Sequence, residues 1–195
     1  NEILATARVS RDIDLFHDSL AALEASWTED RAALEERGHH VEVVRERTGF
    51  VEARVGKDGQ DVLVQWVNDS AYRFFPLVEH PVLGLTLHPF DLATNKVLAL
   101  IGRSEPRDFV DTLACHDRLQ PLGYLAFAAC GKDPGFGPDA IVELAARSSR
   151  YSRAELAGLD FDGPLPDAAD LSRRWHSAVA QARSLVRGLP GEEAG

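Results

Sequence analysis

Three short segments of this chain carry polar side chains at spacings suited to chemistry, and the first covers residues 10–16 (SRDIDLF). In this segment Asp12 and Asp14 alternate with the apolar Ile13 and Leu15, so a strand would place both carboxylates on one side, about 7 Å apart along the backbone. Two such carboxylates repel each other when they lose water, unless a cation lies between them. Mg²⁺ accepts oxygen ligands and keeps positions open for phosphate oxygens and water. The pair therefore indicates phosphate chemistry at a metal ion, with a solvent-exposed edge strand as the simpler alternative.

The second segment covers residues 88–96 and combines Asp91, near an expected helix start, with Lys96 inside an otherwise apolar helix. An acidic side chain near a helix start interacts favourably with the helix dipole, which gives Asp91 an ordinary structural role. A lysine among apolar neighbours either extends its ammonium group to water or binds a buried anion such as a triphosphate. Lys96 is therefore a candidate phosphate ligand.

The third segment covers residues 103–111, and within it Asp108 and Asp111 are three positions apart. At this spacing the two carboxylates share one face of an expected helix. Arg107 and Asp111 are four positions apart, the spacing of an ordinary surface ion pair that adds little stability. Taken alone, the segment is typical of a solvated helix.

These segments need elements that position them, and the pattern of apolar residues predicts an α+β fold. Residues 11–16 alternate as a strand, residues 19–37 follow a helical period that ends at a glycine, and residues 56–59 (GKDG) predict a hairpin turn. The further expected strands are residues 40–47, 50–55 and 61–67, and the expected helices are residues 2–8, 91–102, 106–119, 122–130, 138–147 and 167–186. We therefore expect a small mixed sheet in a lobe of residues 1–88, followed by a helical lobe of residues 89–195.

Composition limits the classes of function that need consideration. The chain of 195 residues has 45% hydrophobic residues and a formal net charge of −10, which favours a packed core and disfavours extended binding of duplex nucleic acid. A local basic patch that engages one end of an RNA is compatible with this charge. The sequence contains no apolar run near the roughly 20 residues that a membrane span needs. Cys115 and Cys130 lie outside metal-binding spacings, so we expect two reduced thiols in a cytoplasmic protein.

In order and spacing, the three segments resemble the motifs of the AbiEii/AbiGii toxin family of nucleotidyltransferases, within the wider DNA polymerase β-like superfamily. Residues 8–16 match the family's Arg-x-Ser-x-Asp-Ile-Asp-Leu-Phe segment, residues 91–96 match its Asp-x-x-x-x-Lys segment, and residues 106–111 match its segment with Arg-Asp-x-x-Asp. The resemblance spans about residues 5–115 and is much less specific in the helices that follow.

The resemblance implies a role for each of four side chains at the reactive centre. Asp12 and Asp14 would be the carboxylates that bind Mg²⁺. Lys96 would hold the phosphates of a nucleoside triphosphate (NTP), as a compact point charge does well. Asp108 would be a further acid that deprotonates or positions the acceptor hydroxyl.

Further residues would support this centre. Arg107 and Asp111 would contact phosphates or support the residues that do. Some members of the family are silenced by antitoxin-driven phosphorylation near the metal site, and the resemblance makes Ser10 a candidate for this control. A phosphate on Ser10 would add about two negative charges beside Asp12, and we expect it to block binding of the metal or the nucleotide. The superfamily also places a third carboxylate on a neighbouring strand. The register that we expect puts Gln65 at that place, and Asp61, two pleats away on the same side, is the candidate for the third metal ligand.

The function that the resemblance implies is that of a toxin which transfers a nucleotide from an NTP to the 3′ end of tRNA and which an antitoxin protein controls. A protein hydroxyl or a small molecule is the alternative acceptor. A third alternative is a relic that binds nucleotide or antitoxin without catalysis. The family has a Gly-Gly or Gly-Ser turn upstream of its first motif, and no such pair precedes Arg8. We therefore expect the chain to start just after that turn. The missing turn and Gln65 favour the relic, whereas the presence of Asp12, Asp14, Lys96 and Asp108 together counts against it.

Overall fold

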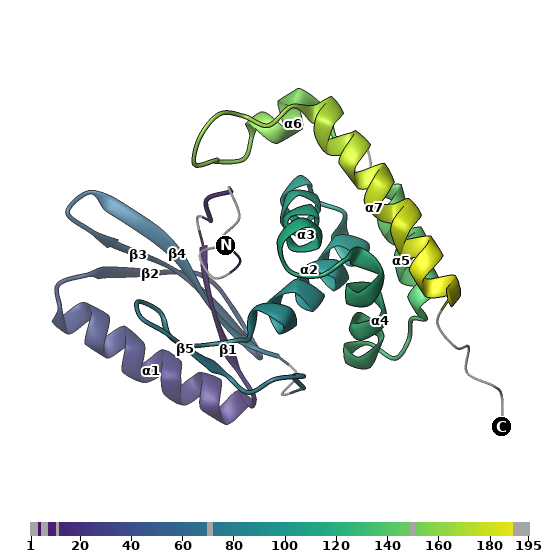
Figure 1. Ribbon diagram of the computed structural model, residues 1–195. Coiled ribbons are helices and arrows are strands. Elements are labelled where there is room, and N and C mark those ends of the chain that lie inside the picture. The colour runs from purple at the N-terminus through teal and green to yellow at the C-terminus, as the bar shows by residue number, and fades with distance from the viewer. Residues whose placement is uncertain (1–3, 5–7, 11, 70–71, 149–150, 189–195) are drawn as a thin grey trace, which may run out of the picture. The chain divides into compact units, whose positions relative to one another are not determined.

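The computed structural model describes residues 4, 8–10, 12–69, 72–148 and 151–188 (Figure 1). The chain divides into two compact units, which we call the sheet unit (Ser10–Tyr72) and the helical unit (Asn1–Val9 with Arg73–Gly195). A sheet followed by helices is the α+β fold that the sequence predicts. The division falls at residue 72 instead of residue 88, and the start of the chain belongs to the helical unit.

The sheet unit contains a four-stranded mixed sheet with strand order β1-β4-β3-β2. Its strands are β1 (Asp12–His17), β2 (His40–Arg47), β3 (Phe50–Lys57) and β4 (Gln60–Asn68). β1 runs parallel to β4, whereas β2, β3 and β4 form an antiparallel meander. The strand at Asp12, the meander and the mixed sheet are therefore confirmed.

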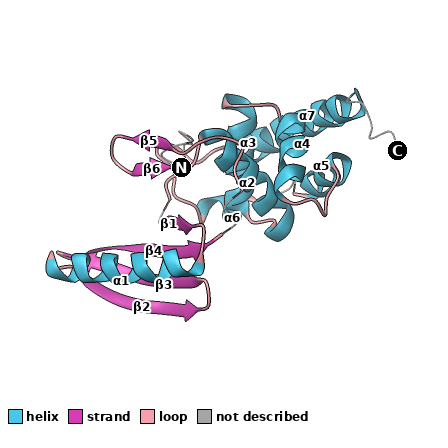
Figure 2. Cartoon of the chain, turned by 90° about the horizontal axis from the view of Figure 1, so that it is seen from below, coloured by secondary structure: helices cyan, strands magenta, loops and turns pink. Residues whose placement is uncertain are grey.

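One helix, α1 (Leu20–Glu36), lies against one face of this sheet (Figure 2). It begins because the side chain of Ser19 accepts a hydrogen bond from the backbone N–H of Ala22. The buried residues between helix and strands are Leu23, Val41, Val51, Ala53, Val55, Val64 and Trp66. The indole N–H of Trp66 donates to Asp30 at 2.8 Å, so this large ring is buried without losing its hydrogen bond. Because strand side chains alternate, the polar positions of the same strands face away from α1.

The turn between β3 and β4 fixes their register. Asp58 and Gly59 have φ of 53° and 80°, the left-handed conformations that a two-residue hairpin turn needs. The predicted Asp-Gly turn is thus confirmed, and it pairs Lys57 with Gln60. Continuing outward from the turn, the same register pairs Glu52 with Gln65.

The helical unit holds a two-stranded sheet and six helices among its described residues. Its elements are β5 (Val78–His80), β6 (Gly84–Thr86), α2 (Pro89–Arg103), α3 (Pro106–Arg118), α4 (Leu122–Lys132), α5 (Pro138–Arg147), α6 (Arg153–Ala157) and α7 (Ala168–Gly188). The five long helices are confirmed, whereas the β5–β6 hairpin and α6 were not predicted. The expected helix at residues 2–8 falls largely outside the described residues, and at its end Arg8 forms an isolated β-bridge with Phe161.

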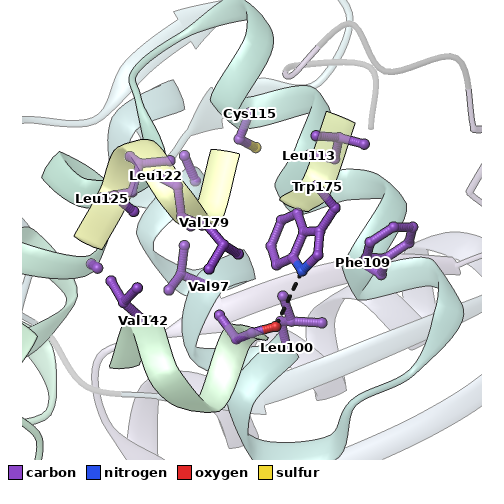
Figure 3. Packing of buried hydrophobic residues seen from close by; sticks show 14 of the residues in the cluster. Val97, Leu100, Phe109, Leu113, Cys115, Leu122, Leu125, Val142, Trp175 and Val179 are labelled. Carbon is purple, nitrogen blue, oxygen red and sulfur yellow. Dashed lines mark hydrogen bonds between the residues drawn. The ribbon is translucent and has the colours of Figure 1, made fainter. Parts of the chain in front are cut away.

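Trp175 lies in the core of the helical unit (Figure 3). It is completely buried, its indole N–H donates to the carbonyl oxygen of Ala145 at 3.3 Å, and its ring lies 5.2 Å from that of Phe109. Both cysteines are free thiols, with Cys115 buried and Cys130 partly exposed, as expected. In the part of the chain that the structure describes, no helix is long and apolar enough to cross a membrane.

Candidate functional site

The predicted site residues fall into two groups, one in each unit, and the first group lies on β1. Asp12 and Asp14 both point to the sheet face opposite α1, because β1 pairs in register with β4. Asp14 is exposed and Asp12 is partly buried. The hydroxyl of Ser10 donates to Oδ1 of Asp12 at 2.5 Å. The structure therefore brings together Ser10 and the two predicted metal-binding acids.

A row of polar side chains continues from Asp14 across this face of the sheet. Asp14 is in register with Gln65, and Gln65 is in register with Glu52. The amide of Gln65 donates to Oε2 of Glu52 at 2.7 Å. Glu52 is only 9% exposed, and two strand spacings put its Cα about 10 Å from that of Asp14. We call Asp14, Gln65 and Glu52 the acidic row.

Glu52 is the carboxylate that the prediction of a third acid missed. The candidate named from sequence, Asp61, is on the same face of β4, but it pairs in register with Gly56 and is highly exposed. Its Oδ2 lies 3.2 Å from Nε of Arg54, an exposed arginine that also contacts Glu42. Counting outward from the Asp-Gly turn at residues 58–59 would have placed Glu52 beside Gln65.

The second group lies in the helical unit and consists of Arg8, Asp111 and Lys96. Arg8 donates two hydrogen bonds to Asp111, from Nε to Oδ1 and from the terminal nitrogen to Oδ2, each of 3.0 Å. Nζ of Lys96 lies 2.9 Å from Oδ2 of Asp111. Burial opposes ionisation of Asp111, but the hydrogen bond and charge of Arg8 and the charge of Lys96 outweigh it, and its pKa is lowered.

The burial of Asp111 corrects one expectation from the sequence. Its side chain has an exposed fraction of 0%, so it is not half of a surface ion pair with Arg107. Nε of Arg107 instead lies 2.7 Å from Oε2 of Glu105, at the start of α3. Arg8, which lies in the first matched segment but had no role assigned from sequence, is the residue that completes this group.

Asp108 forms a separate ion pair one helical turn earlier on α3. Both of its carboxylate oxygens accept hydrogen bonds from Arg103, at 2.6 and 2.8 Å. Asp108 is completely buried, whereas Arg103 is about half exposed, at 47%. The bidentate pair links the end of α2 to the start of α3. In this arrangement Asp108 holds the guanidinium of Arg103 in place through both of its carboxylate oxygens.

Asp91 has the structural role that its position suggests. It is fully buried, and it accepts hydrogen bonds from the backbone N–H groups of Phe74 and Phe75 at 2.9 and 3.1 Å. Nζ of Lys132 lies 3.0 Å from its Oδ1. Burial opposes its ionisation, but the Phe74 hydrogen bond and Lys132 outweigh it, so the pKa of Asp91 is lowered.

The donor chemistry of the two aspartates on β1 suits a hard dication. Asp12 and Asp14 offer carboxylate oxygens side by side, which is the donor type that Mg²⁺ prefers. Within the described residues no group of three or more His, Cys, Asp or Glu side chains is arranged to hold a metal ion on its own. Mg²⁺ in phosphate-handling sites commonly binds one or two carboxylates and takes its other oxygens from substrate phosphates and water. The two aspartates therefore fit Mg²⁺ that is bound together with a phosphate ligand.

Comparisons of this chain with models of protein families, with curated proteins and with solved structures find no significant match. The chemistry of the two groups of residues, and the motif resemblance, are therefore the basis for assigning a function.

Proposed function

We propose that this chain is a Mg²⁺-dependent nucleotidyltransferase that acts as the toxin of a toxin–antitoxin pair and uses the 3′ end of tRNA as acceptor. One observation supports this function above the others. Asp12 and Asp14 lie on the same face of β1, next to a partly buried row that ends in Glu52. The family that the motifs resemble uses an acid pair of this kind for nucleotide transfer.

The two aspartates would hold Mg²⁺, and the bound ion would neutralise charge on the phosphates of an NTP. Ser10 would orient Asp12 through its 2.5 Å hydrogen bond. Gln65 and Glu52 would fix the floor of the site beside Asp14, because their hydrogen bond and the burial of Glu52 restrict their rotamers. Asp12 and Asp14 would thus supply the ligands, and Ser10, Gln65 and Glu52 would support them.

Lys96 would contact the NTP phosphates. Its side chain is 25% exposed, so it reaches solvent, and its contact with Asp111 holds the ammonium group at a defined position. Asp108 would act through Arg103, whose guanidinium it holds in two hydrogen bonds.

In the proposed reaction the acceptor hydroxyl oxygen bonds to the α-phosphorus of the NTP. The bond from that phosphorus to the oxygen that bridges to the β-phosphorus breaks, pyrophosphate leaves with the bonding electrons, and the hydroxyl proton passes to water. The chain's own residues contribute by holding the phosphates in line for this displacement, which is the main protein contribution to transfer of this type.

The test is transfer of label from each of four α-labelled NTPs, with Mg²⁺, onto total tRNA and, in parallel, onto total protein. Asp12→Asn and Lys96→Gln are the test variants. Asp139→Asn, an exposed acid at the start of α5, is the matched control for the first. Label on tRNA that both test variants abolish and that the control retains would support the proposal.

The other outcomes separate the alternatives. Label on protein alone would replace tRNA by a protein hydroxyl as the acceptor. Label on neither, with a folded wild-type protein that still binds NTP, would reject catalysis and leave a nucleotide-binding relic.

A further inference from the structure

The Arg8, Asp111 and Lys96 side chains form a charge network with one anion and two cations. We propose that Arg8 and Asp111 are positioning residues which hold Lys96 as a surplus cation for the triphosphate of the substrate. This inference rests on the proposed function, because it assigns a role to residues around the proposed phosphate ligand. It also makes a prediction about anion binding that requires no catalysis.

The charges of these three side chains sum to one positive charge, because Arg8 and Lys96 are cations and Asp111 is the single anion among the three. Asp111 is ionised at neutral pH, because its pKa lies below the ordinary value in spite of complete burial. Arg8 alone satisfies this carboxylate with two hydrogen bonds of 3.0 Å, the bidentate geometry that binds carboxylates most strongly. Lys96 therefore adds a cation to a pair that is already neutral.

The three side chains differ in how much of each is exposed to solvent, and this difference indicates their roles. Arg8 is 8% exposed and Asp111 is 0% exposed, whereas Lys96 is 25% exposed. An anion that approaches from solvent therefore meets the ammonium group of Lys96 first. When Lys96 turns toward that anion, the buried carboxylate keeps its Arg8 partner. The large cost of leaving a buried charge unpaired is thereby avoided.

A second lysine pair in the same unit lacks this surplus. Lys132 is 9% exposed and makes a one-to-one ion pair with the buried Asp91. Its ammonium group also donates to Asn95 at 2.8 Å. That pair has no net charge and its cation is buried, so we assign it to stability alone.

Contacts from both sides hold the network in place. Arg8 is fixed by its β-bridge to Phe161, and the backbone N–H of Val9 donates to the carbonyl oxygen of Asp160 at 2.9 Å. The hydroxyl of Thr112, next to Asp111 on α3, donates to the carbonyl oxygen of Lys96 at 3.2 Å. These contacts fix the main chain at Arg8 and Lys96 before any ligand binds, which lowers the entropy that binding would cost.

The first test measures binding of inorganic triphosphate to the full chain by titration calorimetry at low salt. Arg8→Gln removes the surplus charge and makes Lys96 the sole partner of a buried carboxylate, so we expect triphosphate to bind at least tenfold more weakly. Arg183→Gln is the matched control, because Arg183 makes a similar two-point contact with Glu143 on the exposed surface. We expect this control to bind triphosphate as the wild type does.

Arg8→Lys is a second variant, which keeps the test informative if Arg8→Gln does not fold. Thermal unfolding of each variant shows whether it is folded. Arg8→Lys keeps the charge, so we expect triphosphate affinity close to that of the wild type, whereas Lys96→Gln loses binding. A folded Arg8→Gln variant with wild-type affinity would overturn the inference. So would equal affinity in wild type, Arg8→Lys and Lys96→Gln, and so would a wild-type chain that does not bind triphosphate.

Asp111→Asn distinguishes positioning from charge. This substitution adds one positive charge to the network, so we expect KM for the NTP to stay level or fall, while kcat falls about tenfold because Lys96 loses its orientation. A rise in KM with unchanged kcat would contradict the positioning role. If no variant or wild-type protein transfers label, but triphosphate binding depends on Arg8 as expected, the proposed function fails and the anion site stands.

Discussion

The side-chain amide of Gln65 donates a 2.7 Å hydrogen bond to Glu52, and this contact extends the acidic row from the exposed Asp14 to a nearly buried carboxylate. Buried carboxylates are rare unless they are bound by a donor, and here the donor is the residue directly opposite Asp14. The strand pairing thus places Glu52 two strands away from the proposed metal ligand Asp14, on the same face of the sheet. The sequence motifs alone do not reveal this position.

Glu52→Gln is expected to lower nucleotide transfer by about 10- to 100-fold, the usual effect of removing a carboxylate that supports a metal ligand. The assay is the labelled-NTP transfer described above, at saturating Mg²⁺. Glu46→Gln is the matched control, since Glu46 is exposed on the neighbouring strand β2 and is paired in register with Val51. Equal activity in the two variants would remove Glu52 from the site. A larger loss in Asp61→Asn than in Glu52→Gln would restore Asp61 as the third acid.

Acidification is expected to destabilise the helical unit through Asp111. Because its folded-state pKa is lowered, ionised Asp111 stabilises the fold above the unfolded value of about 3.9. This contribution is lost as the pH falls below that value and through the folded-state pKa. Denaturant unfolding from pH 7 to pH 2 would measure it. Asp111→Asn should be destabilised at pH 7 by about 3–5 kcal/mol, the usual cost of breaking a buried pair, and should lose less further stability in acid. A wild-type curve that is flat between pH 5 and pH 2 would contradict the expectation.

Phosphorylation of Ser10 is expected to inactivate the proposed site. The Ser10 hydroxyl lies 2.5 Å from Oδ1 of Asp12, so a phosphate there would add about two negative charges next to a metal-binding acid. Ser10→Asp should therefore lose most transfer activity and bind Mg²⁺–NTP more weakly. Ser10→Ala, which removes only the hydrogen bond, should retain much of the activity. An active Ser10→Asp variant would exclude this form of control.

Two glycines in helices are expected to respond in opposite directions to the same substitution. A Cβ at Gly123 on α4 would lie 3.0 Å from Cβ of Leu185 and 3.2 Å from Cα of Ala182, both on α7. Gly123→Ala should thus force α4 and α7 apart and cost about 1–3 kcal/mol. A Cβ at Gly102 on α2 meets nothing within 4 Å, so Gly102→Ala should stabilise by about 0.5–1 kcal/mol. Thermal unfolding of both variants would test the pair, and two shifts of the same sign would contradict the packing described for α4.

The elements around the site could be predicted because their signals are local. Alternation identified the strand of Asp12 and Asp14, the Asp-Gly turn identified the β3–β4 hairpin, and Pro106 marked the start of α3. The sequence also indicated Gln65 at the place of the third acid, and the structure pairs Gln65 with Asp14. Glu52 was within reach of the same reasoning, since a two-residue turn leaves a single register for both strands.

The ion pairs of the helical unit could not be predicted, because they join residues that are far apart in sequence. Nothing local links Arg8 to Asp111, and the i, i+4 spacing favoured Arg107 instead. The β5–β6 hairpin was missed for a different reason. Its strands have three residues each, and Leu85 is 72% exposed, so the segment has no apolar alternation to detect.

The parallel pairing of β1 with β4 also determines when the acid pair can form. The β2–β3–β4 meander joins strands that are adjacent in the chain, and such local pairings close short loops at little entropic cost. β1, by contrast, pairs with a strand that is made only after α1 and the whole meander. A newly synthesised chain therefore exposes Asp12 and Asp14 without a fixed geometry until β4 has left the ribosome, and long-range pairing of this kind is slow. If the chain is the toxin that we propose, its harmful chemistry cannot begin before the sheet unit is complete, and it also has to wait for Lys96, which follows β4 in the chain.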